Sequence, residues 1–154
     1  MRFEPSFRAG LYGTFALLFV TGAGWFVADK LKDAPDGEFW QQLAPTLLMI
    51  HGGTAMIATL FLGALAPIHI RRWWRADRNR VTGAMMVTGN AVLMATAFGL
   101  YYAGSDVLRL WIGNLHLALG LLLPALFLAH VGIALRGKRR WLPSIGRGAK
   151  IERR

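Results

Sequence analysis

Four histidines are the residues in this sequence whose type and position could do chemistry: His51, His69, His116 and His130. Each lies in a stretch without Asp, Glu, Lys or Arg, and the chain contains no cysteine. A neutral imidazole nitrogen is a common ligand of transition metals and of haem iron. Without cysteine, this chain cannot ligate an iron–sulfur cluster or attach a c-type haem covalently. The histidines therefore predict haem held by axial imidazoles alone.

The spacing of the histidines predicts two pairs. His51 and His69 are 18 residues apart and His116 and His130 are 14 apart, which is close to whole helical turns at about 100° per residue. Each pair therefore leaves one face of its helix, and we expect His51 to meet His116 and His69 to meet His130. The two separations along the helix are about 27 Å and 21 Å. This mismatch leaves an alternative to two haems, in which one haem is bound and His69 lies at the headgroup level.

The elements that position these histidines are uncharged stretches long enough to cross a membrane. Residues 9–28, 39–70, 81–105 and 110–135 contain no charged side chain, and about 20 helical residues span the hydrocarbon core. We predict an all-α fold, an integral membrane four-helix bundle in up-down-up-down order. The expected helices cover about 9–28, 43–70, 81–103 and 109–135, with helix 2 starting near Pro45. Residues 1–136 would form the membrane domain and 137–154 a basic tail.

The net charge of +10 is distributed as in a membrane protein. The flanks 1–8, 71–80 and 136–154 hold 15 Lys and Arg with three acids, whereas 29–38 and 106–109 hold three with five acids. This asymmetry is the positive-inside pattern. It predicts cytoplasmic termini and contact of the basic flanks with anionic lipid, and it argues against a nucleic-acid partner.

The segments around the histidines resemble a known family. They are His51-Gly-Gly, Pro67-Ile-His69-Ile-Arg-Arg-Trp, Asn114-Leu-His116 with Gly120, and His130-Val-Gly132. Together with the four helices, they resemble the membrane cytochrome b class, which includes b subunits of formate dehydrogenases and hydrogenases and small four-helix cytochromes. The resemblance implies haem b, quinone as a reactant, and electron transfer with a redox partner on the periplasmic side of a bacterial inner membrane. The surface outside the membrane is too small to hold a dehydrogenase site, so we expect the chain to be an electron-transfer subunit of a larger respiratory oxidoreductase complex, with no catalytic residues predicted.

Basic residues near each pair are candidate partners for haem propionates, which are anionic. Arg71 and Arg72, with Arg75 and Arg136, would serve the cytoplasmic haem, and Arg109, with Lys30 and Lys32, the periplasmic one. Taken singly, each of them is better explained as a topology charge or a lipid contact. The alternative function is a haem-free transporter or a structural anchor subunit. A proton relay usually contains Asp or Glu within the membrane, and none lies in the uncharged stretches.

Overall fold

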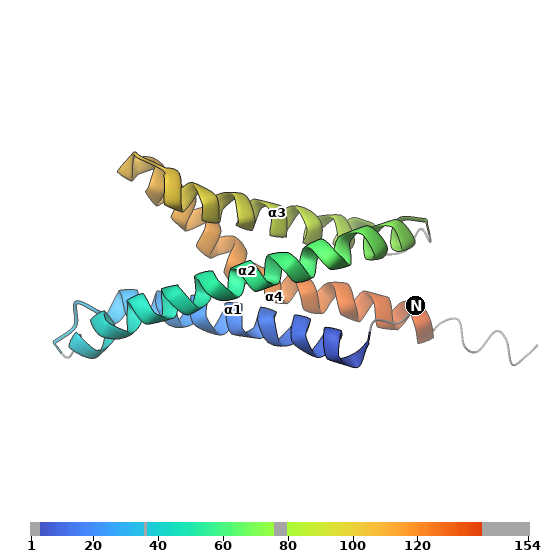
Figure 1. Cartoon of the computed structure of the whole chain (residues 1–154), viewed down its shortest axis with the longest axis horizontal. Helices are drawn as coiled ribbons and strands as arrows, with labels where there is room; N and C mark the ends of the chain where they lie inside the picture. Colours follow the sequence, from blue (N-terminus) through green and yellow to red (C-terminus); the bar gives the residue numbers. More distant parts are fainter. Residues whose placement is uncertain (1–3, 36, 76–79, 140–154) are drawn as a thin grey trace, which may run out of the picture.

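Each uncharged stretch of the sequence forms the middle of a long helix in the computed structural model of the protein (Figure 1). The structure describes residues 4–35, 37–75 and 80–139, and the side chains of these except 68–75 and 137–139. The helices are α1 (Pro5–Leu31), α2 (Glu38–Arg75), α3 (Arg80–Tyr102) and α4 (Asp106–Arg139). The described part of the chain contains no strand. The all-α four-helix fold is therefore confirmed.

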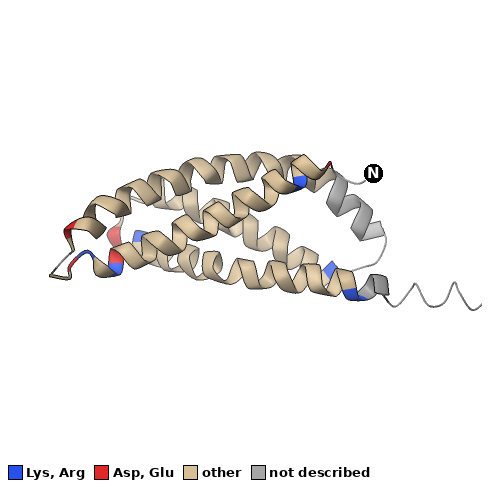
Figure 2. Ribbon diagram, turned by 90° about the horizontal axis from the view of Figure 1, so that it is seen from below, with Lys and Arg blue, Asp and Glu red and all other residues tan. Residues whose placement is uncertain are grey.

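All four helices are long and apolar enough to span a membrane. The membrane-compatible segments are Pro5–Leu31, Glu38–Pro67, Arg80–Tyr102 and Asp106–Arg136. The shortest has 23 residues and would measure about 35 Å, more than the roughly 30 Å of a hydrocarbon core. The described charged residues gather at the two ends of the bundle, and the middle carries none (Figure 2). This is a multi-pass membrane protein.

The helices alternate in direction and form two hairpins. The α1–α2 and α3–α4 connections lie at one end of the bundle, while the start of α1 and the end of α4 lie at the other (Figure 1). The close approaches are made mainly between α1 and α2 and between α3 and α4. Among the described residues, no Cα atom of α2 lies within 8 Å of a Cα atom of α4. The bundle is thus two tight hairpins with a wider separation between α2 and α4.

Glycines on the first helix of each hairpin allow these close approaches. A Cβ atom at Gly10 would lie 2.9 Å from the Phe61 ring, and one at Gly99 would lie 3.0 Å from Ile112. Small residues of this kind let membrane helices pack backbone against side chain. Of the described side chains, few are buried, and they are all small: Thr21, Ala28, Thr54, Ala58 and Thr96. Many large apolar side chains are exposed, among them Met56, Leu60 and Leu128, as expected of a protein surrounded by lipid.

The helices begin earlier than the sequence predicted. Helix α2 starts at Glu38 rather than near Pro45, which lies inside it. A proline inside a membrane helix is tolerated because neighbouring groups can bond the backbone carbonyl that it leaves unpaired. The acidic Glu38 stabilises the earlier start, because it lies at the positive end of the helix dipole. Helix α4 starts at Asp106 because the Ser105 hydroxyl accepts a hydrogen bond from the Leu108 amide at 3.4 Å, the usual N-cap arrangement.

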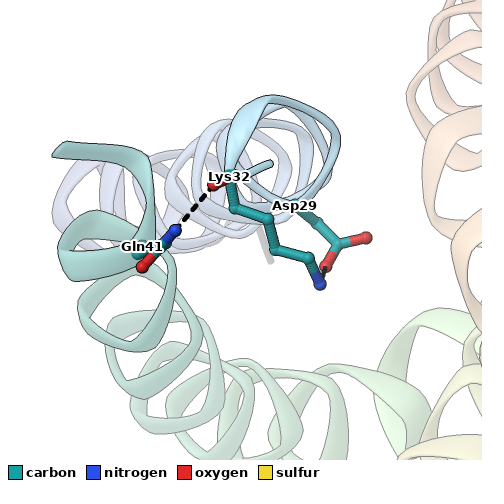
Figure 3. A network of polar contacts seen from close by, with 3 residues as sticks. All are labelled: Asp29, Lys32 and Gln41. Atoms are coloured by element: carbon teal, nitrogen blue, oxygen red, sulfur yellow. Dashed lines mark hydrogen bonds and ion pairs between the residues drawn. The ribbon is translucent and has the colours of Figure 1, made fainter. Parts of the chain in front are cut away.

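The α1–α2 connection is held by a polar network (Figure 3). The Lys32 ammonium donates to the Asp29 carboxylate at 2.7 Å, and Gln41 Nε2 donates to the Lys32 carbonyl at 2.8 Å. The hydrogen bond that Lys32 donates to Asp29 raises the pKa of Lys32 above its usual value, and the negative charge of that carboxylate adds to the effect. The network ties the end of α1 to the first turn of α2 and sets the hairpin geometry.

Candidate functional site

Two of the four histidines approach each other inside the bundle, in the half nearer the α1–α2 and α3–α4 connections. The rings of His51 on α2 and His116 on α4 have centres 6.3 Å apart and planes inclined by 79°. Both residues are half-buried. Here the side chains of α2 and α4 come close, although no described Cα atoms of the two helices lie within 8 Å of each other. The structure therefore brings together the pair that sequence spacing predicted, and their binding of haem stays a prediction.

The outer side of the His51 ring is bound to α1. Its Nδ1 lies 3.1 Å from the Thr21 hydroxyl and 3.1 Å from the Leu18 carbonyl oxygen. A Cβ atom at Gly22 would lie 3.0 Å from His51 Cε1, so the ring packs directly on the α1 backbone. Helix α1, which contains no histidine, thus fixes the orientation of the His51 imidazole.

The His116 ring is held in the same manner by α3. Its Nδ1 lies 2.8 Å from the Thr96 hydroxyl. In each hairpin, therefore, a threonine on the first helix binds Nδ1 of a histidine on the second. Nε2 lies on the far side of an imidazole ring from Nδ1, and no hydrogen bond within the described residues occupies Nε2 of His51 or His116. This nitrogen is the one left to bind a ligand.

The distance between the rings suits two ligands on opposite sides of one metal ion. An imidazole nitrogen binds a metal at about 2.0–2.1 Å, and its ring centre lies about 1 Å further away. Two such rings have centres about 6 Å apart, close to the observed 6.3 Å. Within the described residues, no cluster of three or more His, Cys, Asp or Glu is placed to hold a metal ion. A metal between these rings would take its remaining ligands from a cofactor.

Glycines beside the two histidines leave room for a flat cofactor. Gly120 lies one turn beyond His116, on the same face of α4. A Cβ atom at Gly120 would meet no other atom of the described residues within 4 Å. At Gly52 and Gly113, the nearest atoms are the Tyr101 hydroxyl and Leu100, each at 3.8 Å. The residues present therefore fit a planar group placed between α2 and α4.

The second level of histidines is described on one side only. His130 Nδ1 lies 2.9 Å from the Thr82 hydroxyl, and a Cβ atom at Gly83 would lie 3.8 Å from His130 Cε1. This repeats the arrangement at His116, about 21 Å further along α4. The side chains of His69, Arg71 and Arg72 lie outside the described residues, so the pairing of His69 with His130 stays a prediction.

Arg109, the predicted propionate partner, lies at the α3–α4 end of the bundle. It is exposed, and its guanidinium donates to the Ala103 carbonyl oxygen at 3.3 Å. It precedes His116 by seven residues, which is two turns, so both lie on one face about 10 Å apart along the axis. Arg109 closes the end of α3 and is on the correct face to meet an anionic group of a cofactor at His116.

The sequence analysis missed the threonines that hold the histidines. Threonine is a common packing residue of membrane helices, so residue type alone does not distinguish Thr21, Thr82 and Thr96 from other small residues. The signal that would have found them is a hydroxyl on the helix before each histidine, at a matching depth in the up-down order. Thr21 and Thr96 are 3% and 8% exposed, whereas most of the bundle is open to lipid. No protein-family model, curated protein or solved structure matched this chain.

Proposed function

We propose that this protein is a b-type cytochrome that binds haem between α2 and α4. His51 and His116 would be the axial ligands of one haem. The observation that carries the proposal is the 6.3 Å separation of the two rings, each tied through Nδ1 to a threonine. A ligating imidazole commonly makes such a hydrogen bond through its other nitrogen. The four porphyrin nitrogens would supply the metal ligands that the protein lacks at this level.

A second haem would bind at the other level, with His130 and His69 as ligands. The hydrogen bond between His130 and Thr82 supports this assignment, because it repeats the arrangement at His116. Arg109 would meet the propionates of the first haem, and Arg71 and Arg72 those of the second. Haem b supplies a one-electron carrier, and two of them about 20 Å apart would connect the two faces of the membrane.

The role that fits two such levels is electron transfer across the membrane between quinone and a redox partner protein. The described helices offer no soluble catalytic domain, which favours a subunit of a respiratory complex with its partner on the periplasmic side. The excess of Lys and Arg in the flanks 1–8, 71–80 and 136–154 favours a bacterial inner membrane with both termini in the cytoplasm. Reporter fusions test this orientation: one in residues 71–80 should be cytoplasmic and one in 29–38 periplasmic, and the reverse would contradict it.

The experiment that tests the proposal is a pyridine haemochrome assay on the purified full chain. We expect haem b, two per chain, which quinol analogues reduce and quinones oxidise. One haem per chain would leave the His51–His116 site and remove the second. A folded, colourless and iron-free protein would contradict the proposal and favour a haem-free transporter or anchor subunit. Haem without quinone reactivity would contradict the role in electron transfer.

A further inference from the structure

We propose that Thr21 and Thr96 are positioning residues that hold His51 and His116 in one tautomer, with the hydrogen on Nδ1. Each ring then presents an unprotonated Nε2 to the space between α2 and α4. The identity of the ligand there rests on the proposed function, whereas the tautomer follows from the hydrogen bonds alone. Both threonines lie on helices that contain no histidine, so their hydroxyls act across each hairpin.

The geometry at Thr21 leaves only one direction for its bond to His51. A hydroxyl has one hydrogen, and Thr21 Oγ1 lies 2.7 Å from the Leu17 carbonyl oxygen, which can only accept. With that hydrogen donated to Leu17, Oγ1 is an acceptor toward the ring at 3.1 Å. The Leu18 carbonyl oxygen, also 3.1 Å from Nδ1, is a second group that can only accept. The hydrogen must therefore be on His51 Nδ1.

The same reasoning applies to Thr96 and His116. Thr96 Oγ1 lies 2.8 Å from the Val92 carbonyl oxygen and 3.0 Å from that of Leu93, so its hydrogen is donated to the backbone of α3. Its lone pair then accepts from His116 Nδ1 at 2.8 Å. Both hydroxyls are almost fully buried, and the surrounding spans carry no charged side chain that could compete. The α1–α2 and α3–α4 hairpins thus contain the same device.

This device changes what the histidines can bind. In a free neutral imidazole the hydrogen is shared between the two nitrogens, and the form with hydrogen on Nε2 cannot ligate a metal through that atom. Fixing it on Nδ1 keeps the Nε2 lone pair available. When the threonine oxygen accepts the hydrogen bond from Nδ1, the imidazole ring also becomes a stronger electron donor through Nε2. The threonines would therefore tighten haem binding and lower its reduction potential.

The test compares Thr21→Val and Thr96→Val, which keep the shape and remove the hydroxyl, with Thr21→Ser and Thr96→Ser, which keep it. Thr14→Val is the matched control, because Thr14 is half-buried on α1 and, among the described residues, its hydroxyl bonds only the Gly10 carbonyl oxygen, at 2.8 Å. The tautomer is read from nitrogen-15 spectra of the full chain labelled at histidine, before haem is added. Haem affinity and reduction potential are then measured on the loaded protein.

We expect hydrogen on Nδ1 of His51 and His116 in the wild type and in the Ser and control variants. The Val variants should show a mixture of tautomers, an affinity for haem lower by about 10- to 100-fold, and a higher reduction potential. Hydrogen on Nε2 in the wild type, or Val variants with unchanged spectra and potential, would overturn the proposal. If the wild type takes up no haem, the proposed function fails, and the spectra alone then decide the role of the threonines.

Discussion

The contacts within each hairpin differ in kind from the contact between α2 and α4. Within the α1–α2 hairpin, glycines pack on side chains, as Gly10 does on Phe61, and aromatic rings meet edge to face, as Phe7 and Phe61 do with centres 5.2 Å apart. Between α2 and α4, the backbones stay apart and two polar rings face each other. The two helices of each hairpin therefore pack directly on each other, whereas α2 and α4 approach through the imidazole rings of His51 and His116.

Contacts inside the hairpins both stabilise the fold and orient the histidines between α2 and α4. Apolar contact with lipid gives little drive for helix association, so small residues and interhelical hydrogen bonds hold each hairpin. The same hydrogen bonds orient the histidines, because each threonine on α1 or α3 binds a ring on α2 or α4. The same threonine–histidine contacts therefore hold each hairpin together and orient its imidazole ring. The following variants separate that feature from the α2–α4 site.

The largest expected effect comes from removing an imidazole. His51→Ala or His116→Ala would remove an axial ligand of the proposed haem, so the first haem should be lost or become five-coordinate and high-spin, which is about half of the total haem if two are bound. His69→Ala should cause the complementary loss at the second level. Haem content and the absorption spectrum of the purified variants measure both. If His69→Ala leaves both unchanged, His69 is an interfacial residue and His130 has another partner.

A large effect is also expected from filling the α2–α4 separation. Gly120→Leu places a side chain on the face of His116, where a Cβ atom now meets nothing within 4 Å. It should remove the first haem, about half of the total if two are bound, because a planar group and a leucine cannot occupy one place. Ala118→Leu is the control, since Ala118 is exposed on a different face of α4. Equal haem content in the two variants would place the cofactor elsewhere.

A smaller effect is expected inside the hairpin. Gly22→Ala puts a methyl group 3.0 Å from His51 Cε1 and 3.3 Å from Nδ1. The ring must move by a few tenths of an ångström, and overpacking of this kind costs about 1–3 kcal/mol. Thermal unfolding should occur at a lower temperature, with a changed haem spectrum. Gly13→Ala is the matched control, because a Cβ atom there meets no described residue within 4 Å, and it should stabilise α1 by about 0.5–1 kcal/mol. The same response from both would remove Gly22 from the site.

The smallest effect is expected at the end of the α1–α2 hairpin. Asp29→Asn removes the ion pair with Lys32. The Asp29 side chain is 33% exposed and that of Lys32 is 43% exposed. Exposed pairs contribute little to stability, so thermal unfolding near neutral pH should not change measurably. The raised pKa of Lys32 means that any contribution of the pair is present below the usual value of 10.5 and is lost as the pH rises above it. A clear loss of stability at neutral pH would show that the connection matters more than the packing of the hairpin.

The sequence predicted the helices and the meeting of His51 with His116, because uncharged length and whole-turn spacing depend only on regular helix geometry. It did not predict the true starts of α2 and α4, because Pro45 suggested a helix start and the cap at Ser105 is a local detail. It also missed Thr21 and Thr96, whose role depends on which faces of neighbouring helices meet. That information is a property of the packing and has no periodic signal in one sequence.

The measurement that tests the central claim most directly is near-infrared magnetic circular dichroism of the oxidised, purified chain, supported by electron paramagnetic resonance. Both report the axial ligands of haem iron without any variant. The account predicts low-spin ferric haem with two imidazole ligands in the wild type, and loss of that signal at one site in His116→Ala. A colourless protein, or haem with any axial ligand set other than two imidazoles at the site that His116→Ala removes, would contradict it.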